Sequence, residues 1–140
     1  MFTLVPAAVL DEWKHLAAQV RGVLSEAGLP VAAEGDDDYF AGVTVDVDPG
    51  DDEAGGVFVL WRPHRRLGNA VVVSVTEQRM DDPVLRHFGA IAEAMRQAIW
   101  SILDSAGFTV TDPQTDYRPL QLQVVDGPAD PTPTAADPTA

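Results

Sequence analysis

A short basic cluster is the segment whose residue types most readily suggest chemistry. Its members are Trp61, Arg62, Pro63, His64, Arg65 and Arg66, and it holds three of the nine lysine and arginine residues of the chain. Guanidinium groups donate paired hydrogen bonds that match a carboxylate, so the cluster could bind an anion or an acidic side chain. The alternative is a solvated loop between two strands, attracted to the protein's own aspartate-rich loops.

Acidic residues are concentrated in two predicted loops, at residues 34–38 and 46–53. Carboxylates on a loop are the ligands that Ca²⁺ prefers in proteins. The EF-hand spacing fails, however, because a loop that begins at Asp46 has Asp51 where glycine is needed and Val57 where the closing glutamate is needed. We therefore expect solvent-exposed charges at these positions and predict no metal ion.

Other patterns of catalytic residues are missing from the sequence. The chain has no cysteine, which excludes disulfides and thiolate chemistry. Its three histidines, at positions 15, 64 and 87, do not pair at a zinc-binding spacing, and no serine lies in a G-x-S-x-G motif. There is also no glycine-rich phosphate loop. We predict no catalytic residue and no cofactor, and we favour a function without enzymatic activity.

Two long amphipathic helices are predicted, at residues 6–27 and 83–106, because apolar residues recur there at helical spacing. Both end in the pattern Leu-x-x-Ala-Gly-apolar-x-Val, at residues 24–31 and 103–110. Glycine just beyond a helix can adopt a positive φ at low cost. The second helix also has a start signal, since Asp81 or Asp82 can cap it and Pro83 fits its first turn.

The remaining apolar segments have strand-like patterns. They are residues 40–48, 57–62, 70–76, 108–111 and 120–125, with a further short strand possible at residues 29–33. We predict an α+β two-layer fold in which an antiparallel sheet of five to six strands packs with the two helices, in the order α-β-β-β-α-β-β. Residues 1–126 are expected to form one domain. Residues 127–140, rich in Pro, Thr and Ala, are expected to form a disordered tail.

The formal net charge of −13 limits the classes of partner. Such a surface repels nucleic-acid phosphates and anionic membranes, so we expect neither as a partner. The apolar N-terminal segment has no basic residue, and Asp11 and Glu12 interrupt it too early for a membrane span. We therefore predict a cytoplasmic protein.

Uncovered apolar surface predicts association with protein. Two helices can cover only one face of the predicted sheet, and residues 57–60 are apolar on both faces. The leftover area favours a homodimer or a complex with another protein. Tryptophans at the margin of a buried face often mark an interface. The predicted partner-binding residues are Trp61, Arg62, Arg65, Arg66 and Trp100.

The order of the elements over residues 6–125, the small size and the acidity resemble the small acidic secretion-chaperone-like fold. Proteins of that fold bind protein partners as dimers, and here a strand and tail replace their third helix. We therefore predict a non-enzymatic protein-binding module, such as a chaperone, adaptor or immunity-like protein, acting as a dimer. The alternative is a small-ligand, anion or metal-binding domain that uses the Arg62–Arg66 loop or the Asp-rich loops. An enzyme with a carboxylate or arginine site is the third possibility.

Overall fold

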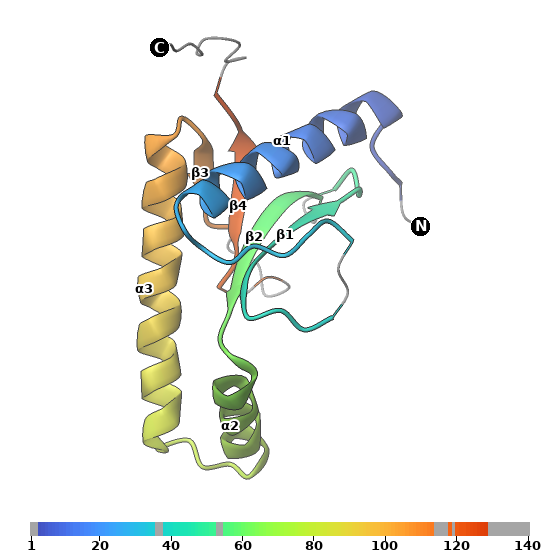
Figure 1. Ribbon diagram of the computed structural model, residues 1–140. Helices are drawn as coiled ribbons and strands as arrows, with labels where there is room; N and C mark the ends of the chain where they lie inside the picture. Colours follow the sequence, from blue (N-terminus) through green and yellow to red (C-terminus); the bar gives the residue numbers. More distant parts are fainter. Residues whose placement is uncertain (1–2, 36–37, 53–54, 114–117, 119, 129–140) are drawn as a thin grey trace.

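The computed structural model describes residues 3–35, 38–52, 55–113, 118 and 120–128, in which three helices accompany one four-stranded sheet (Figure 1). The elements are α1 (Ala7–Glu26), β1 (Gly42–Asp48), β2 (Gly56–Arg62), α2 (Arg65–Thr76), α3 (Pro83–Ser105), β3 (Thr109–Thr111) and β4 (Leu122–Asp126). The predicted α+β class and antiparallel sheet are confirmed. The described sheet has four strands rather than five or six, and a third helix is present.

The two predicted long helices correspond to α1 and α3, and both end as their sequences indicate. Gly28 and Gly107 follow the two helices with φ values of 97° and 96°. Asp82 caps α3, because its Oδ1 accepts a hydrogen bond of 3.0 Å from the backbone N–H of Val84. These local signals therefore set the ends of the two elements that support the sheet.

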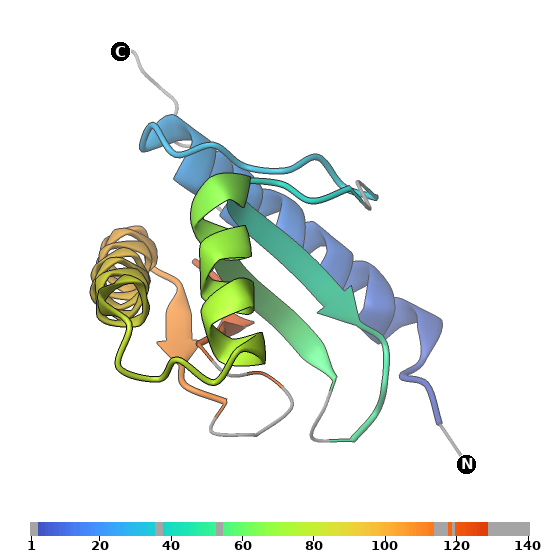
Figure 2. The same cartoon turned by 90° about the horizontal axis from the view of Figure 1, so that it is seen from below.

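The sheet has the strand order β1-β2-β4-β3, and one of its faces forms the core of the protein. Alternate residues of three strands point to this face and are buried: Val43, Val45, Val57, Val59, Leu122 and Val124. Both α1 and α3 cover it, with α1 crossing diagonally behind β1 and β2 and α3 seen almost end-on in Figure 2. The helices contribute Leu16, Ala17, Val20, Leu24, Ile99 and Leu103.

The strand predicted at residues 70–76 is wrong, because this segment is helical and belongs to α2. Its β-branched residues favour a strand only weakly, and tertiary packing can override such a preference. His64 caps the helix by accepting the backbone N–H of Arg66 at 3.0 Å. Arg65 and Arg66 consequently lie in the first turn of α2 and not in a loop between two strands.

Two further expectations differ from the structure or lie outside it. The short strand predicted at residues 29–33 is reduced to a single parallel bridge between Val31 and Val43. Of the predicted tail, residues 129–140 lie outside the described residues.

The second face of the sheet is not the open apolar surface that the sequence predicted. Phe58 points to this face, yet only 1% of it is exposed. The guanidinium of Arg118 lies 3.6 Å from the centroid of the Phe58 ring and forms an ion pair of 2.8 Å with Asp48. The neighbouring β1 residues on this face, Thr44 and Asp46, are polar. The chain therefore covers Phe58 itself, which removes the largest apolar side chain on which association through the sheet was predicted.

Strand β1 lies at one edge of the sheet, and other parts of the chain satisfy several of its outward-facing groups. The carbonyl of Val45 accepts a hydrogen bond of 2.8 Å from the side chain of Arg21 on α1. Val43 exchanges two backbone hydrogen bonds of 2.9 Å with Pro30 and Ala32. The open edge is thus partly closed from within the chain.

Candidate functional site

Helix α2 and the N-terminal half of α3 form a lobe that projects from the sheet (Figure 1). We call residues 65–93 the helical lobe. Ser74, the one buried residue of α2, donates a hydrogen bond of 2.7 Å to Oδ2 of Asp82, which also caps α3. The N–H of Val84, and next the hydroxyl of Ser74, lower the pKa of Asp82 below its ordinary value of 3.8. One ionised carboxylate therefore links the two helices of the lobe.

A groove of about 430 Å³ runs beside α2 at the point where the lobe meets the sheet. Its lining is largely apolar, and no acidic residue is among the described residues that form it: Tyr39, Arg62, Pro63, Arg65, Gly68, Asn69, Val71, Val72 and Phe88. The segment before β1, the end of β2 and both helices of the lobe contribute to it. We call this feature the α2 groove.

Two arginines share one aromatic ring at the rim of the α2 groove. The guanidinium carbons of Arg62 and Arg65 lie 5.8 and 5.2 Å from the centroid of the Tyr39 ring. The Tyr39 hydroxyl donates a hydrogen bond to the carbonyl of Pro63, which fixes the ring. Among the described residues, neither arginine forms an ion pair. Cation–π contact relieves the repulsion between two such charges only in part, so the rim favours an anion.

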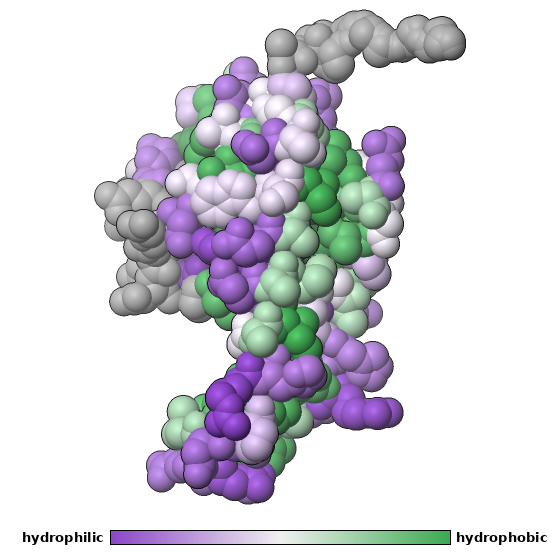
Figure 3. Space-filling view, turned by 90° about the vertical axis from the view of Figure 1, so that its left-hand side faces the viewer, coloured by the Kyte–Doolittle hydropathy of each residue, from purple (hydrophilic) through white to green (hydrophobic). Residues whose placement is uncertain are grey.

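Next to the groove, α2 exposes valines rather than polar residues. Val72 is 62% exposed and Val75 is 48% exposed. Val72 follows Gly68 by four residues, and Val75 follows Val72 by three, so the three residues lie on one face of the helix. Figure 3 shows the lobe as the narrow end of the molecule, where hydrophobic residues adjoin strongly hydrophilic ones. Helix α2 therefore departs from the usual pattern of a surface helix at two points, because polar Ser74 is buried and valines are exposed.

The structure brings together three of the five predicted partner-binding residues. Arg62 and Arg65 line the α2 groove, and the Trp61 ring stacks on Phe88, another lining residue, with centroids 6.5 Å apart. Arg66 instead borders a separate shallow hollow of about 300 Å³ with His64 and Leu67.

Trp100 is placed away from the groove. It is half-buried, packs on the edge of the core and carries the guanidinium of Arg96 at 5.6 Å from its ring centroid. Trp100 follows Phe88 by twelve residues of α3, a distance of about 18 Å along the helix. The two predicted tryptophans therefore do not belong to one surface.

Among the groove residues that were not predicted from the sequence, Tyr39, Val72 and Phe88 are the large side chains that shape the candidate site. The position of Val72 follows directly once residues 65–76 are read as a helix, because Gly68, Val72 and Val75 then share a face. Tyr39 and Phe88 carry no local signal. They reach the groove through the tertiary fold, from segments far apart in the sequence.

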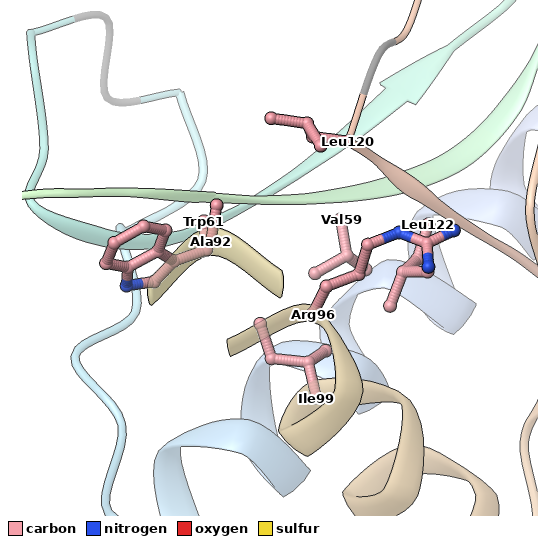
Figure 4. A pocket seen from close by; sticks show the side chains of 7 residues that line it. All are labelled: Val59, Trp61, Ala92, Arg96, Ile99, Leu120 and Leu122. Carbon is pink, nitrogen blue, oxygen red and sulfur yellow. The ribbon is translucent and has the colours of Figure 1, made fainter. Parts of the chain in front are cut away.

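A second cavity, shown in Figure 4, lies between β2 and α3 and is too small for a substrate. Its volume of about 10 Å³ is close to the minimum for one water molecule. Trp61, Leu120 and Leu122 are among its mostly apolar lining residues. The Arg96 guanidinium forms an ion pair of 2.8 Å with Asp112. A cavity of this size does not provide a binding site for a substrate.

The acidic loops do not assemble a metal site in the described part of the chain. Within that part, no group of three or more histidine and acidic residues is placed to hold an ion. Asp48 is engaged instead, since it bonds to Arg118 and accepts the N–H of Gly50 at 3.0 Å. Glu53 and residues 36–37 of the acidic loops lie outside the described residues.

None of the described helices is both long and apolar enough to cross a lipid bilayer. Comparisons of the chain with protein-family models, with curated proteins and with solved structures gave no significant match. The helical lobe and the α2 groove are therefore the features from which a function can be inferred.

Proposed function

We propose that this protein is a non-enzymatic protein-binding module, and that its partner docks on the helical lobe along the α2 groove. The observation that carries the proposal is the outward valine face of α2, which adjoins an apolar groove with an arginine rim. Single exposed apolar residues are normal on a protein surface, but a contiguous apolar patch rimmed by polar groups is typical of an interaction site.

The composition of the surface supports the same function. Covering Val72 and Val75 would release about 1 kcal/mol for each valine, because both are about half exposed and full burial of a valine contributes about 1.5–3 kcal/mol. Tyrosine and arginine are enriched in the cores of protein interfaces, and the rim offers Tyr39 with two arginines. The residues with the greatest capacity to bind protein are therefore close together.

The lobe also presents this surface in a fixed position. His64 caps the start of α2, and Asp82 joins α2 to the start of α3. A surface that is ordered before binding loses less conformational entropy when the partner arrives. This arrangement favours recognition of a partner over a purely structural role for α2.

The homodimer predicted from the sequence depended on an open face of the sheet. Because Arg118 covers Phe58 on that face, a dimer would have to form through another part of the surface, such as the helical lobe. Sedimentation velocity of the wild-type chain, compared with a Val72→Asp variant, tests this arrangement directly.

A second candidate function is binding of a small carboxylate-bearing molecule in the same groove. Its volume of about 430 Å³ falls in the range of small-molecule sites, and Arg62 and Arg65 would bind the carboxylate. A thermal-shift screen against small carboxylic acids tests this function. A rise in melting temperature that Arg65→Glu abolishes would favour it over protein binding.

The main experiment compares two adjacent valines. Val72→Asp places a charge beside the groove, whereas Val73→Asp places one about 100° further around α2, at a residue that is 45% exposed. Crosslinking in the native cell with the wild type should capture a stoichiometric protein that the Val73→Asp variant retains and the Val72→Asp variant loses. Equal retention by both variants would exclude the lobe as the binding surface.

A further inference from the structure

The charge around the α2 groove indicates the chemistry of its partner. The helical lobe, residues 65–93, has four arginines and four acidic residues, a net charge of zero, whereas the whole chain has a net charge of −13. Charges more than about 8 Å apart in water are largely screened at physiological ionic strength. A partner at the groove therefore responds chiefly to the nearby arginines and not to the distant acidic surface.

The shape of the site favours a helical occupant. Gly68, Val72 and Val75 form a ridge on α2 with the i, i+4, i+7 spacing on which another helix packs. Val71 of α2 and Phe88 of α3 both line the adjoining groove. An amphipathic helix that lays its apolar face into a hydrophobic groove is a recurring mode of peptide recognition. The 12 residues of α2 extend over about 18 Å, enough to contact about three turns of a partner helix.

Building on the proposed function, we infer that the α2 groove binds an acidic amphipathic helix of another protein. The aliphatic side chains of that helix cover Val72 and Val75, and its aspartate or glutamate residues pair with Arg62 and Arg65. The groove has two guanidinium groups at its rim, and the part of its lining that the structure describes holds no carboxylate, so the partner supplies the negative charge that pairs with them.

A second copy of this chain fits the groove less well. Two-fold association brings the same patch of both copies together. Each patch would bring Arg62 and Arg65 and no lining carboxylate, so like charges would accumulate in one interface. Nucleic acid is also disfavoured, because the lobe has no net positive charge and belongs to a strongly acidic chain.

The test uses a phage-displayed library of random 16-residue peptides, panned on the full chain. We expect the selected peptides to carry aliphatic residues at helical spacing and more acidic than basic residues. A synthetic peptide of the consensus sequence is then titrated against two charge-reversal variants. Arg65→Glu should weaken binding at least tenfold, and Arg66→Glu less than threefold. The two variants change the net charge equally within one helical turn, but only Arg65 lines the groove.

Folding should not complicate this comparison, since a glutamate in the first turn of a helix interacts favourably with the helix dipole. Circular dichroism melting of both variants checks this point. The inference fails if the selected peptides show no acidic bias, or if Arg65→Glu and Arg66→Glu have equal effects. It also fails if the wild type sediments as a dimer that Val72→Asp converts to a monomer, because the occupant is then a second copy.

The same panning separates this inference from the proposed function. Peptides that bind the wild type and Val73→Asp but not Val72→Asp support docking on the lobe, whatever their charge. If that pattern appears without an acidic bias, protein binding stands and only the acidic partner is rejected. If Val72→Asp still selects the same peptides, or if no peptide is selected at all, both proposals fail.

Discussion

Gln78 is the most informative position at which to test the structure of the lobe. It follows α2 with a φ of 60°, in the left-handed region where glycine is the usual residue. Its N–H donates to the carbonyl of Val75 at 3.0 Å, and the N–H of Arg79 donates to the carbonyl of Ser74 at 2.8 Å. These two bonds terminate the helix and turn the chain toward α3, so we predict that Gln78→Gly stabilises the protein.

The size of the effect follows from two opposing terms. A left-handed backbone costs an ordinary residue about 1–2 kcal/mol, which glycine does not incur. Glycine also gives the unfolded chain more conformational freedom, which costs about 0.4–1 kcal/mol. The net gain in the free energy of unfolding is about 0.5–1 kcal/mol, equivalent to a rise of about 2–4 °C in the melting temperature.

The neighbouring Glu77 provides a matched control, because its φ is −89°. Glu77→Gly brings only the entropic cost of glycine and should lower the free energy of unfolding by about 0.5–1 kcal/mol. Loss of its exposed ion pair with Arg79 adds little. Thermal melts and urea denaturation, followed by circular dichroism, measure both variants. If Gln78→Gly destabilises the protein as much as Glu77→Gly does, α2 does not end in a left-handed residue.

Four further predictions concern Asp82, Gly22, Gly42 and Arg118. Because the pKa of Asp82 is lowered in the folded protein, its contribution to stability is present above about pH 4 and is lost as the pH falls through its folded pKa. Asp82→Asn removes this contribution. Urea denaturation between pH 2 and 6 should therefore show a free energy of unfolding that depends less on pH in the variant than in the wild type. Gly22→Ala should stabilise α1 by about 0.5–1 kcal/mol, because its methyl group meets open space. Gly42→Ala should lower the free energy of unfolding by more than about 1 kcal/mol, because the φ of Gly42 is 136° and the new methyl group would lie 2.7 Å from the backbone oxygen of Pro30. A melting temperature equal to that of the wild type would contradict this. Arg118→Ala should lower the free energy of unfolding by about 1–2 kcal/mol by uncovering Phe58, as measured by urea denaturation; an unchanged midpoint would refute this role.

The elements with strong local signals were predictable from the sequence. An apolar stripe, a capping Asp82 and a glycine at the end predict α3 because each signal acts within one or two helical turns. In helix α2 these signals are weaker. Polar Ser74 lies in the middle of its buried stripe, its cap is a histidine, and its left-handed terminal residue is Gln78 rather than glycine. The β-branched run therefore favoured a strand, and only packing against α3 makes the segment helical.

The candidate site was predictable only where its composition is unusual. Arg62 and Arg65 stand out because basic residues are rare in this chain, and both line the α2 groove. Tyr39 and Phe88 join them from segments more than twenty residues away on either side, which no local pattern reveals. The second face of the sheet could not be anticipated for the same reason, because Arg118 reaches Phe58 across sixty positions.

The guarded edge of β1 has a consequence for how this protein behaves when concentrated. An edge strand with free N–H and C=O groups is a template for cross-β aggregation. Here the side chain of Arg21 donates a hydrogen bond to the carbonyl of Val45, and the backbone N–H and C=O of Val43 are bonded to Pro30 and Ala32. Asp46 adds a charge along the strand. Strand-to-strand growth into fibrils would first have to displace these contacts, so concentrated solutions should resist amyloid formation.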